Sequence, residues 1–131
     1  MNEVIKFLTD NHVFYLTTVD GDVPKVRPFG FVMEYDGKMC FCTNNRKNVY
    51  RQMKANPNIE ICAVSPTDGW LRLSGRAVFI TTRDAKLAAL KAMPSLERMY
   101  SADDEIFEVF ALEDAQAAIY GATGASRTIA L

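Results

Sequence analysis

Apolar and polar residues alternate along much of the chain, and short turn sequences rich in Gly, Asp and Pro separate the alternating runs. Alternation predicts strands, because successive side chains of a strand point to opposite faces of its sheet. The predicted strands cover residues 12–19, 23–33, 39–43, 59–64, 70–81 and 105–112. Residues 115–120 fit no single element, and residues 127–131 are either a short edge strand or a tail.

Three segments instead repeat apolar residues at helical spacing, which predicts helices with one buried face. The first is an N-terminal segment with Val4, Ile5 and Leu8 on one face and Asn2 as its cap. The second covers residues 46–55 and is capped by Asn45. The third covers residues 83–92 and is capped by Thr81 or Thr82. Ser, Thr, Asn and Asp are the preferred caps, because their side chains accept a hydrogen bond from a free N–H of the first turn.

Two Asp-Gly pairs stand between apolar runs, at Asp20-Gly21 and Asp36-Gly37. This dipeptide is a strong hairpin signal. The first three strands are therefore expected to form an antiparallel meander, and Gly75 inside a long alternating run predicts a β-bulge.

Strands outnumber helices, and no strand–helix–strand alternation is seen, which favours a closed antiparallel barrel over a doubly wound sheet. The helix between the third and fourth strands does not suit an up-and-down meander such as a lipocalin. We therefore expect a mainly β fold, a six-stranded antiparallel Greek-key split barrel with peripheral helices. The 131 residues fit one domain, 1–131, which leaves room for a cofactor site only if two copies share it.

Charge and composition exclude several function classes. Fifteen basic and 16 acidic residues give a net charge of −1, so general nucleic-acid binding is not expected. No apolar run approaches the roughly 20 residues that span a bilayer, and the N-terminus lacks a basic region followed by an apolar one. The expected location is the cytoplasm, with no membrane partner.

The three cysteines are expected to be reduced thiols, because their number is odd and Cys40 and Cys42 lie on the same face of one strand. Cys62 and the single His12 do not complete a zinc-like ligand set, so no metal is expected. A lone histidine at the edge of a strand also argues against a Ser–His or Cys–His nucleophile, and no catalytic side chain is assigned.

Cations gather where the third strand runs into the second helix. Lys25 and Arg27 lie on one strand, and Arg46 and Lys47 lie at the start of the helix. A helix N-terminus carries free N–H groups and positive partial charge, and cations are usually disfavoured there. Together these features favour a pocket for an anion such as a phosphate, with the Thr43 hydroxyl beside it. The alternative is that these Lys and Arg side chains are solvated and bind no ligand.

These segments resemble the FMN-binding split-barrel family, which includes pyridoxamine 5'-phosphate oxidase and smaller nitroimidazole-resistance-like proteins. The resemblance covers nearly the whole chain. It is carried by Val26-Arg27-Pro28-Phe29-Gly30-Phe31, Asp36-Gly37-Lys38, Phe41-Cys42-Thr43-Asn44, Lys47, Asn56-Pro57 and Trp70-Leu71-Arg72-Leu73-Ser74-Gly75-Arg76-Ala77.

The resemblance implies a homodimer that holds two FMN molecules at the subunit interface. Residues 27–30 would follow the ribityl chain and the isoalloxazine edge, and Lys47 would neutralise the phosphate with help from Arg46. Trp70 would reach across from the second subunit to cover the flavin. The implied cofactor-binding residues are Arg27, Pro28, Phe29, Gly30, Cys42, Thr43, Asn44, Lys47 and Trp70.

Two departures argue against vitamin B6 oxidation. The oxidase has a basic residue five positions after the strand arginine, where this chain has Val32, and only residues 121–131 with Arg127 could replace its C-terminal substrate segment. The favoured function is an FMN-dependent oxidoreductase that acts on a small aromatic or nitro compound with a reductant such as NADH or NADPH. One alternative is a flavin sensor or store without turnover. Another is a split barrel that binds deazaflavin, with Arg51 and Lys54 as further cations. A third is a split barrel that binds haem, with His12 as the lone imidazole.

Overall fold

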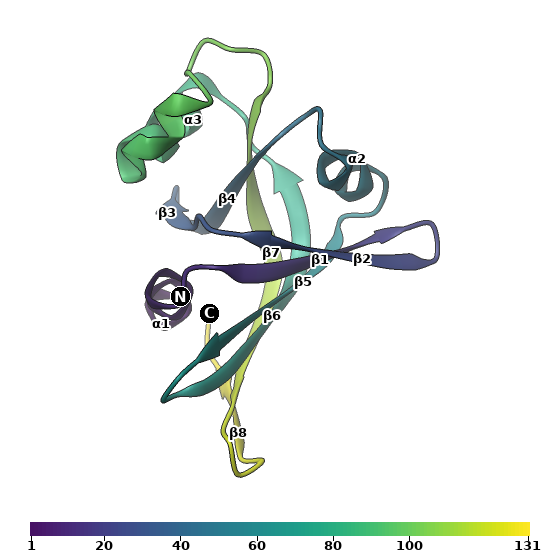
Figure 1. The fold of residues 1–131 in the computed structure, drawn as a ribbon, viewed down its shortest axis with the longest axis vertical. Coiled ribbons are helices and arrows are strands. Elements are labelled where there is room, and N and C mark those ends of the chain that lie inside the picture. Colours follow the sequence, from purple (N-terminus) through teal and green to yellow (C-terminus); the bar gives the residue numbers. More distant parts are fainter.

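The computed structural model describes residues 1–131 and shows a mainly β protein with eight strands and three α-helices (Figure 1). The helices are α1 (Asn2–Asp10), α2 (Asn48–Ala55) and α3 (Arg83–Ala92), followed by a 3-10 turn, η1 (Pro94–Arg98). The strands are β1 (Phe14–Asp20), β2 (Val23–Phe29), β3 (Met33–Tyr35), β4 (Lys38–Asn44), β5 (Asn58–Ser65), β6 (Gly69–Phe79), β7 (Phe107–Tyr120) and β8 (Ser126–Ile129).

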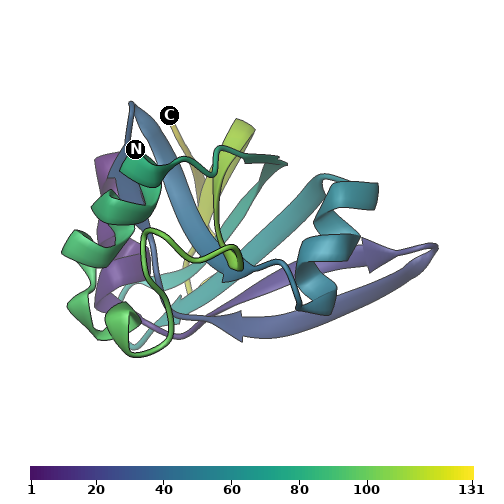
Figure 2. The ribbon, with the colours of Figure 1, turned by 90° about the horizontal axis from the view of Figure 1, so that it is seen from above.

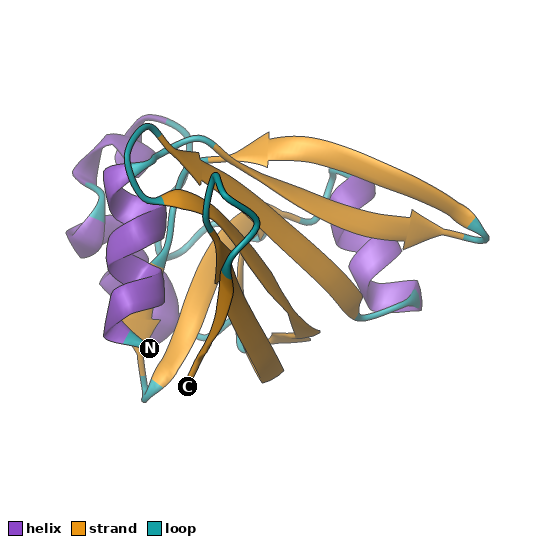
Figure 3. Ribbon diagram, turned by 90° about the horizontal axis from the view of Figure 1, so that it is seen from below, coloured by secondary structure: helices purple, strands orange, loops and turns teal.

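All strands belong to one antiparallel sheet with the order β2-β1-β5-β6-β7-β4-β3, and β8 pairs with β7. The sheet is strongly twisted and curls around its core, as Figure 3 shows from below. The end strands β2 and β3 do not pair with each other, so the sheet is not closed. The predictions of six strands and of a closed barrel are therefore wrong, whereas the mainly β, antiparallel class is confirmed.

The strand count differs first because the predicted strand 23–33 is two strands. β2 pairs only with β1, and β3 pairs only with β4 at the far end of the sheet, so the expected three-stranded meander is also wrong. The break has a packing cause: Phe29 packs against one apolar cluster, whereas Phe31 and Met33 belong to a second one. In one continuous strand Phe29, Phe31 and Met33 would share a face, so the regular alternation must break between Phe29 and Phe31 to supply both clusters.

The second difference lies at the C-terminal end. The predicted strand 105–112 continues to Tyr120, and β8 pairs with this extension, which confirms the edge-strand reading of the last residues. The predicted bulge is confirmed, because the β6–β7 register shifts between Ser74 and Arg76. A side chain at Gly75 would lie 2.8 Å from the Glu113 carbonyl oxygen, so only glycine fits there.

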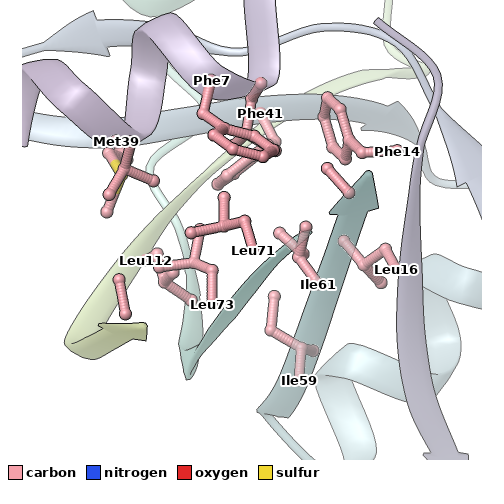
Figure 4. Packing of buried hydrophobic residues seen from close by; sticks show 14 of the residues in the cluster. Phe7, Phe14, Leu16, Met39, Phe41, Ile59, Ile61, Leu71, Leu73 and Leu112 are labelled. Atoms are coloured by element: carbon pink, nitrogen blue, oxygen red, sulfur yellow. The ribbon is translucent and has the colours of Figure 1, made fainter. Parts of the chain in front are cut away.

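The larger apolar cluster fills the inside of the curled sheet and is covered by α1 and α2 (Figure 4). Phe41 and Phe110 stack at 5.4 Å between ring centroids, and Phe14 meets Phe41 edge to face. The smaller cluster lies between α3 and the other face of β4 and β7, where Cys40 and Phe107 are fully buried. Alternation along β4 thus serves both clusters, because its odd and even positions face opposite sides.

Helix α3 spans the predicted residues and is capped as predicted, with the Thr82 hydroxyl accepting a hydrogen bond from the Ala85 N–H at 3.1 Å. Replacing Thr82 with alanine is expected to lower the free energy of unfolding by about 1 kcal/mol, the usual value of such a cap. Urea denaturation measures this change. Thr82→Ser should retain most of the stability, and Thr67→Ala in an exposed turn serves as control; equal loss in Thr82→Ala and Thr67→Ala would contradict the capping role.

No helix in the structure is long and apolar enough to cross a membrane.

Candidate cofactor site

A cleft of about 770 Å³ lies between the β1–β2 hairpin and helix α2. Figure 2 shows α2 lying over this hairpin, which extends away from the rest of the sheet. Side chains from both elements line the cleft, among them Lys25, Arg27, Lys47 and Arg51. The structure therefore brings together cations that lie up to 26 residues apart in the sequence, from Lys25 to Arg51.

None of these four cations has an acidic partner. Every ion pair of the protein involves other residues, and Asp20 is the one acid that lines the cleft. Cations in other parts of the surface, such as Lys38 and Arg83, do pair with carboxylates. The cleft therefore concentrates unbalanced positive charge, which favours an anionic ligand.

The N-terminus of α2 adds backbone donors to this charge. The helix begins at Asn48, with Lys47 as the cap residue in extended conformation, and no side chain caps it. The predicted cap Asn45 and start at Arg46 are wrong: the Asn45 amide oxygen caps no N–H of α2, and its amide nitrogen donates to the Glu105 carbonyl at 2.7 Å and to the Glu108 carboxylate at 2.9 Å. The first N–H groups of α2 thus remain free of side-chain acceptors.

Arg27 turns inward, between β1 and α2. Its guanidinium donates to the Thr18 hydroxyl at 2.8 Å, to the Gln52 amide oxygen at 2.8 Å and to the Leu16 carbonyl at 3.2 Å. Burial lowers the pKa of Arg27, but an arginine remains charged at neutral pH. Because all its partners are neutral, Arg27 is held in place without losing its attraction for an anion.

Sequence reasoning missed Thr18 and Gln52. Thr18 is fully buried, and its hydroxyl also lies 2.5 Å from the Gln52 amide oxygen, so the two side chains and Arg27 form one network. The inward position of Thr18, two residues after Leu16, could have been found from strand alternation. Gln52 could not, because its role depends on how α2 packs against β1.

The three residues after Arg27 do not share one environment. Pro28 lines the cleft. Phe29 points into the core, with its ring centroid 6.2 Å from that of Phe110. Gly30 is exposed, with open space where a side chain would be. Of these three residues, only Pro28 therefore lines the cleft.

The predicted residues of β4 also face different ways. Cys42 packs against the smaller apolar cluster, where burial raises the pKa of its thiol to about 12, an effect that the nearby Lys47 opposes. Thr43 points to the other side and is buried, and its hydroxyl has no hydrogen-bond partner. The Asn44 amide donates to the Tyr100 hydroxyl at 2.8 Å, which makes it part of the loop structure.

Trp70 lies outside the cleft. Its ring stacks on that of Tyr120 at 4.4 Å between centroids, and the Arg72 guanidinium lies over both rings. It lines a different cavity, which lies between α1 and the β7–β8 hairpin. Within this chain, Trp70 and Lys47 therefore do not share a site.

Thr43 does not line the cleft, but its buried hydroxyl has no hydrogen-bond partner, and such a group is costly unless it serves a ligand. Replacing Thr43 with valine is expected to leave the ligand-free protein as stable or stabilise it by about 1 kcal/mol. If the hydroxyl serves a ligand, Thr43→Val should at the same time weaken FMN binding. Urea denaturation with and without FMN measures both effects, with Thr128→Val on β8 as control. A Thr43→Val protein that is less stable without FMN would contradict this reading.

Comparisons with known proteins identify the family of this chain. A family model described as pyridoxamine 5'-phosphate oxidase matches residues 1–120. A solved structure of a NimC/NimA family protein from Clostridium acetobutylicum is 41% identical, with a TM-score of 0.95, over 100% of this chain and 92% of that one. No curated protein sequence matches the chain.

More distant solved structures share the fold alone. A heme binding protein from Mycobacterium smegmatis is 19% identical, with a TM-score of 0.74, over 97% of this chain and 56% of that one. An FAD-binding protein from Mesorhizobium loti is 18% identical, with a TM-score of 0.60, over 88% and 91% of the two chains. The family match over residues 1–120 and the 41% identical relative show the family. The chain belongs to the pyridoxamine 5'-phosphate oxidase family and is closely related to its NimC/NimA proteins.

Proposed function

We propose that this protein binds FMN and is an FMN-dependent oxidoreductase that acts on a small molecule. The observation that carries the proposal is the cleft beside α2, where four cations without acidic partners meet an uncapped helix N-terminus. A phosphate monoester dianion is the group that such a combination of cations and N–H groups binds best. FMN ends in one phosphate of this kind.

Each site residue has a role in this proposal. Lys47 and the first N–H groups of α2 bind the phosphate, and Arg27, held by Thr18 and Gln52, adds charge at the floor of the cleft. The Thr43 hydroxyl supplies a hydrogen bond that the protein alone leaves unused. When bound, FMN supplies the hydride and electron transfer, and the protein contributes binding, orientation and electrostatics.

A homodimer is part of the proposal, supported by the outer face of the sheet. Tyr15, Val26 and Val64 are all large apolar side chains that are about half exposed or more, at 49%, 64% and 67%. Strand register places them on the face turned away from the core, and Trp70 lies on the same face, directly opposite Val64. Val26 also lines the cleft. A second copy covering this face would therefore border the phosphate site.

The proposed substrate is a small aromatic or nitro compound, reduced at the expense of NADH or NADPH. The similarity to a NimC/NimA family protein favours this substrate class over vitamin B6 oxidation. Val32 packs against the apolar core and offers no charge in place of the oxidase's basic residue.

The visible spectrum of the purified protein, titrated with FMN and then given NADH or NADPH without oxygen, tests the proposal. Flavin bands should shift on binding, bleach with the nicotinamide and return when a nitroaromatic acceptor is added. A protein that binds no flavin would refute the proposal. Binding without bleaching would favour a flavin sensor or store, and preferential binding of haem or a deazaflavin would identify a different cofactor.

A further inference from the structure

We infer that Asn45 and Tyr100 are positioning residues for the phosphate site, an inference that rests on the proposed function. Neither side chain lines the cleft. Both instead hold the loop 44–47, which carries Lys47 to the start of α2, against the segment that leads into β7 (residues 100–108). The affinity of the cleft for phosphate would then depend on contacts made more than 50 residues away along the chain, from Asn44 to Tyr100.

Asn45 makes three contacts to this segment. Its backbone N–H donates to the Ile106 carbonyl at 2.9 Å, and its amide donates to the Glu105 carbonyl and the Glu108 carboxylate. These bonds continue the β4–β7 pairing, which formally ends at Asn44 and Phe107. The loop is therefore anchored to the sheet immediately before Lys47.

Glu108 is itself held on both sides. One carboxylate oxygen accepts from Asn45, and the other accepts from the Thr81 hydroxyl at 2.8 Å. The Thr81 hydroxyl also accepts the Val109 N–H at 3.1 Å. Glu108 is thus locked between the end of β6 and the loop, so it provides a fixed acceptor for Asn45.

Tyr100 provides the second anchor. Its hydroxyl accepts from the Asn44 amide at 2.8 Å, and its ring stacks on Phe107 at 4.5 Å between centroids. The other end of the Asn44 side chain accepts the Arg46 N–H at 3.1 Å. The Asn44 side chain therefore links Tyr100 to Arg46, the residue that precedes Lys47.

The segment that carries Tyr100 is rigidly built. The Asp104 carboxylate accepts the N–H groups of Ser101 at 2.8 Å, Ile106 at 3.1 Å and Phe107 at 2.8 Å. Lys86 of α3 donates to the Asp104 carbonyl at 2.8 Å. The acceptors that hold the loop 44–47 therefore belong to a segment that is fixed by its own hydrogen bonds, so they can fix the position of the loop in turn.

The test compares Asn45→Ala and Tyr100→Phe with matched controls, Asn58→Ala and Tyr35→Phe. Asn58 bonds only to Asn56 nearby, and the Tyr35 hydroxyl makes no hydrogen bond, so these controls remove the same groups outside the network. The measurement is the ratio of the dissociation constants for riboflavin and FMN. This ratio isolates the contribution of the phosphate, which a general loss of stability would not change.

We expect the ratio to fall about five- to tenfold in Asn45→Ala and less in Tyr100→Phe, because each lost hydrogen bond is worth roughly a factor of that size. The controls should keep the wild-type ratio. Amide hydrogen exchange should also become faster in residues 44–50 of Asn45→Ala, with no FMN present.

The phosphate site and the positioning role of Asn45 and Tyr100 can be refuted separately. If the wild-type protein binds riboflavin and FMN with equal dissociation constants, the phosphate site is refuted, and the positioning role is refuted with it. A high wild-type ratio that Asn45→Ala and Tyr100→Phe both retain would overturn only the positioning role. Unchanged hydrogen exchange in Asn45→Ala would likewise show that the loop keeps its shape without these anchors.

Discussion

Replacing Lys47 with alanine is expected to weaken FMN binding by about 1.5 to 3 kcal/mol, which is the value of a charge-assisted hydrogen bond. The corresponding loss of affinity is roughly ten- to more than a hundredfold. Lys47 caps α2 with its backbone, while its exposed side chain lines the cleft and has no partner in the protein. Removing the side chain should therefore change binding and leave the stability of the ligand-free protein almost unaltered.

Fluorescence titration of the flavin measures the effect, with riboflavin as a second ligand. Affinity for riboflavin should be nearly the same in wild type and Lys47→Ala, because riboflavin has no phosphate. Lys91→Ala, which removes an exposed cation from the last turn of α3, is the matched control for net charge. If both variants lose FMN affinity equally, the effect comes from overall charge and Lys47 has no specific role.

Replacing Phe110 with alanine should produce the largest loss of stability, about 3 to 5 kcal/mol. Phe110 is fully buried, and its ring contacts those of Phe29, Phe41 and Phe79. Truncation leaves a cavity between residues of four strands, which cannot all move inward because each is fixed by its sheet pairing. Since Phe29 belongs to the strand that lines the cleft, the variant should also bind FMN less tightly.

Urea denaturation measures the unfolding free energy, and Leu87→Ala is the control because Leu87 is 41% exposed on α3. The unfolding free energy of Leu87→Ala should fall by only a fraction of the loss seen in Phe110→Ala. Phe110→Leu, which keeps most of the apolar volume, should recover a large part of the stability. A Phe110→Ala protein within 1 kcal/mol of wild type would contradict the central position of this ring, given the usual cost of such truncations, about 3 to 5 kcal/mol.

Several features could be predicted from local sequence because local chemistry determines them. Helix α3 has the predicted bounds and cap, since Thr82 bonds within its own first turn. The bulge at Gly75 is as predicted, and the Asp36-Gly37 turn has both residues at positive φ, as its hairpin requires. These features depend on residues that are neighbours along the chain.

The errors arose where distant residues compete for the same group. Asn45 is a good cap by residue type, but its amide nitrogen bonds to acceptors at Glu105 and Glu108, and α2 starts two residues later than predicted, at Asn48 rather than Arg46. The run 23–33 alternates like one strand, but two separate apolar clusters divide it. Neither competitor can be recognised from the neighbouring sequence.

The sequence by itself determined the strand and turn chemistry, the family, and the cations on which the proposed phosphate site rests, because residue type and spacing along the chain suffice for these. Only the tertiary structure decided that Arg27 is held by Thr18 and Gln52, that the Thr43 hydroxyl has no partner, and that Trp70 lies apart from the cleft. The physical reason is that a side chain's partners are set by which strands and helices pack together, and these come from segments far apart in the chain.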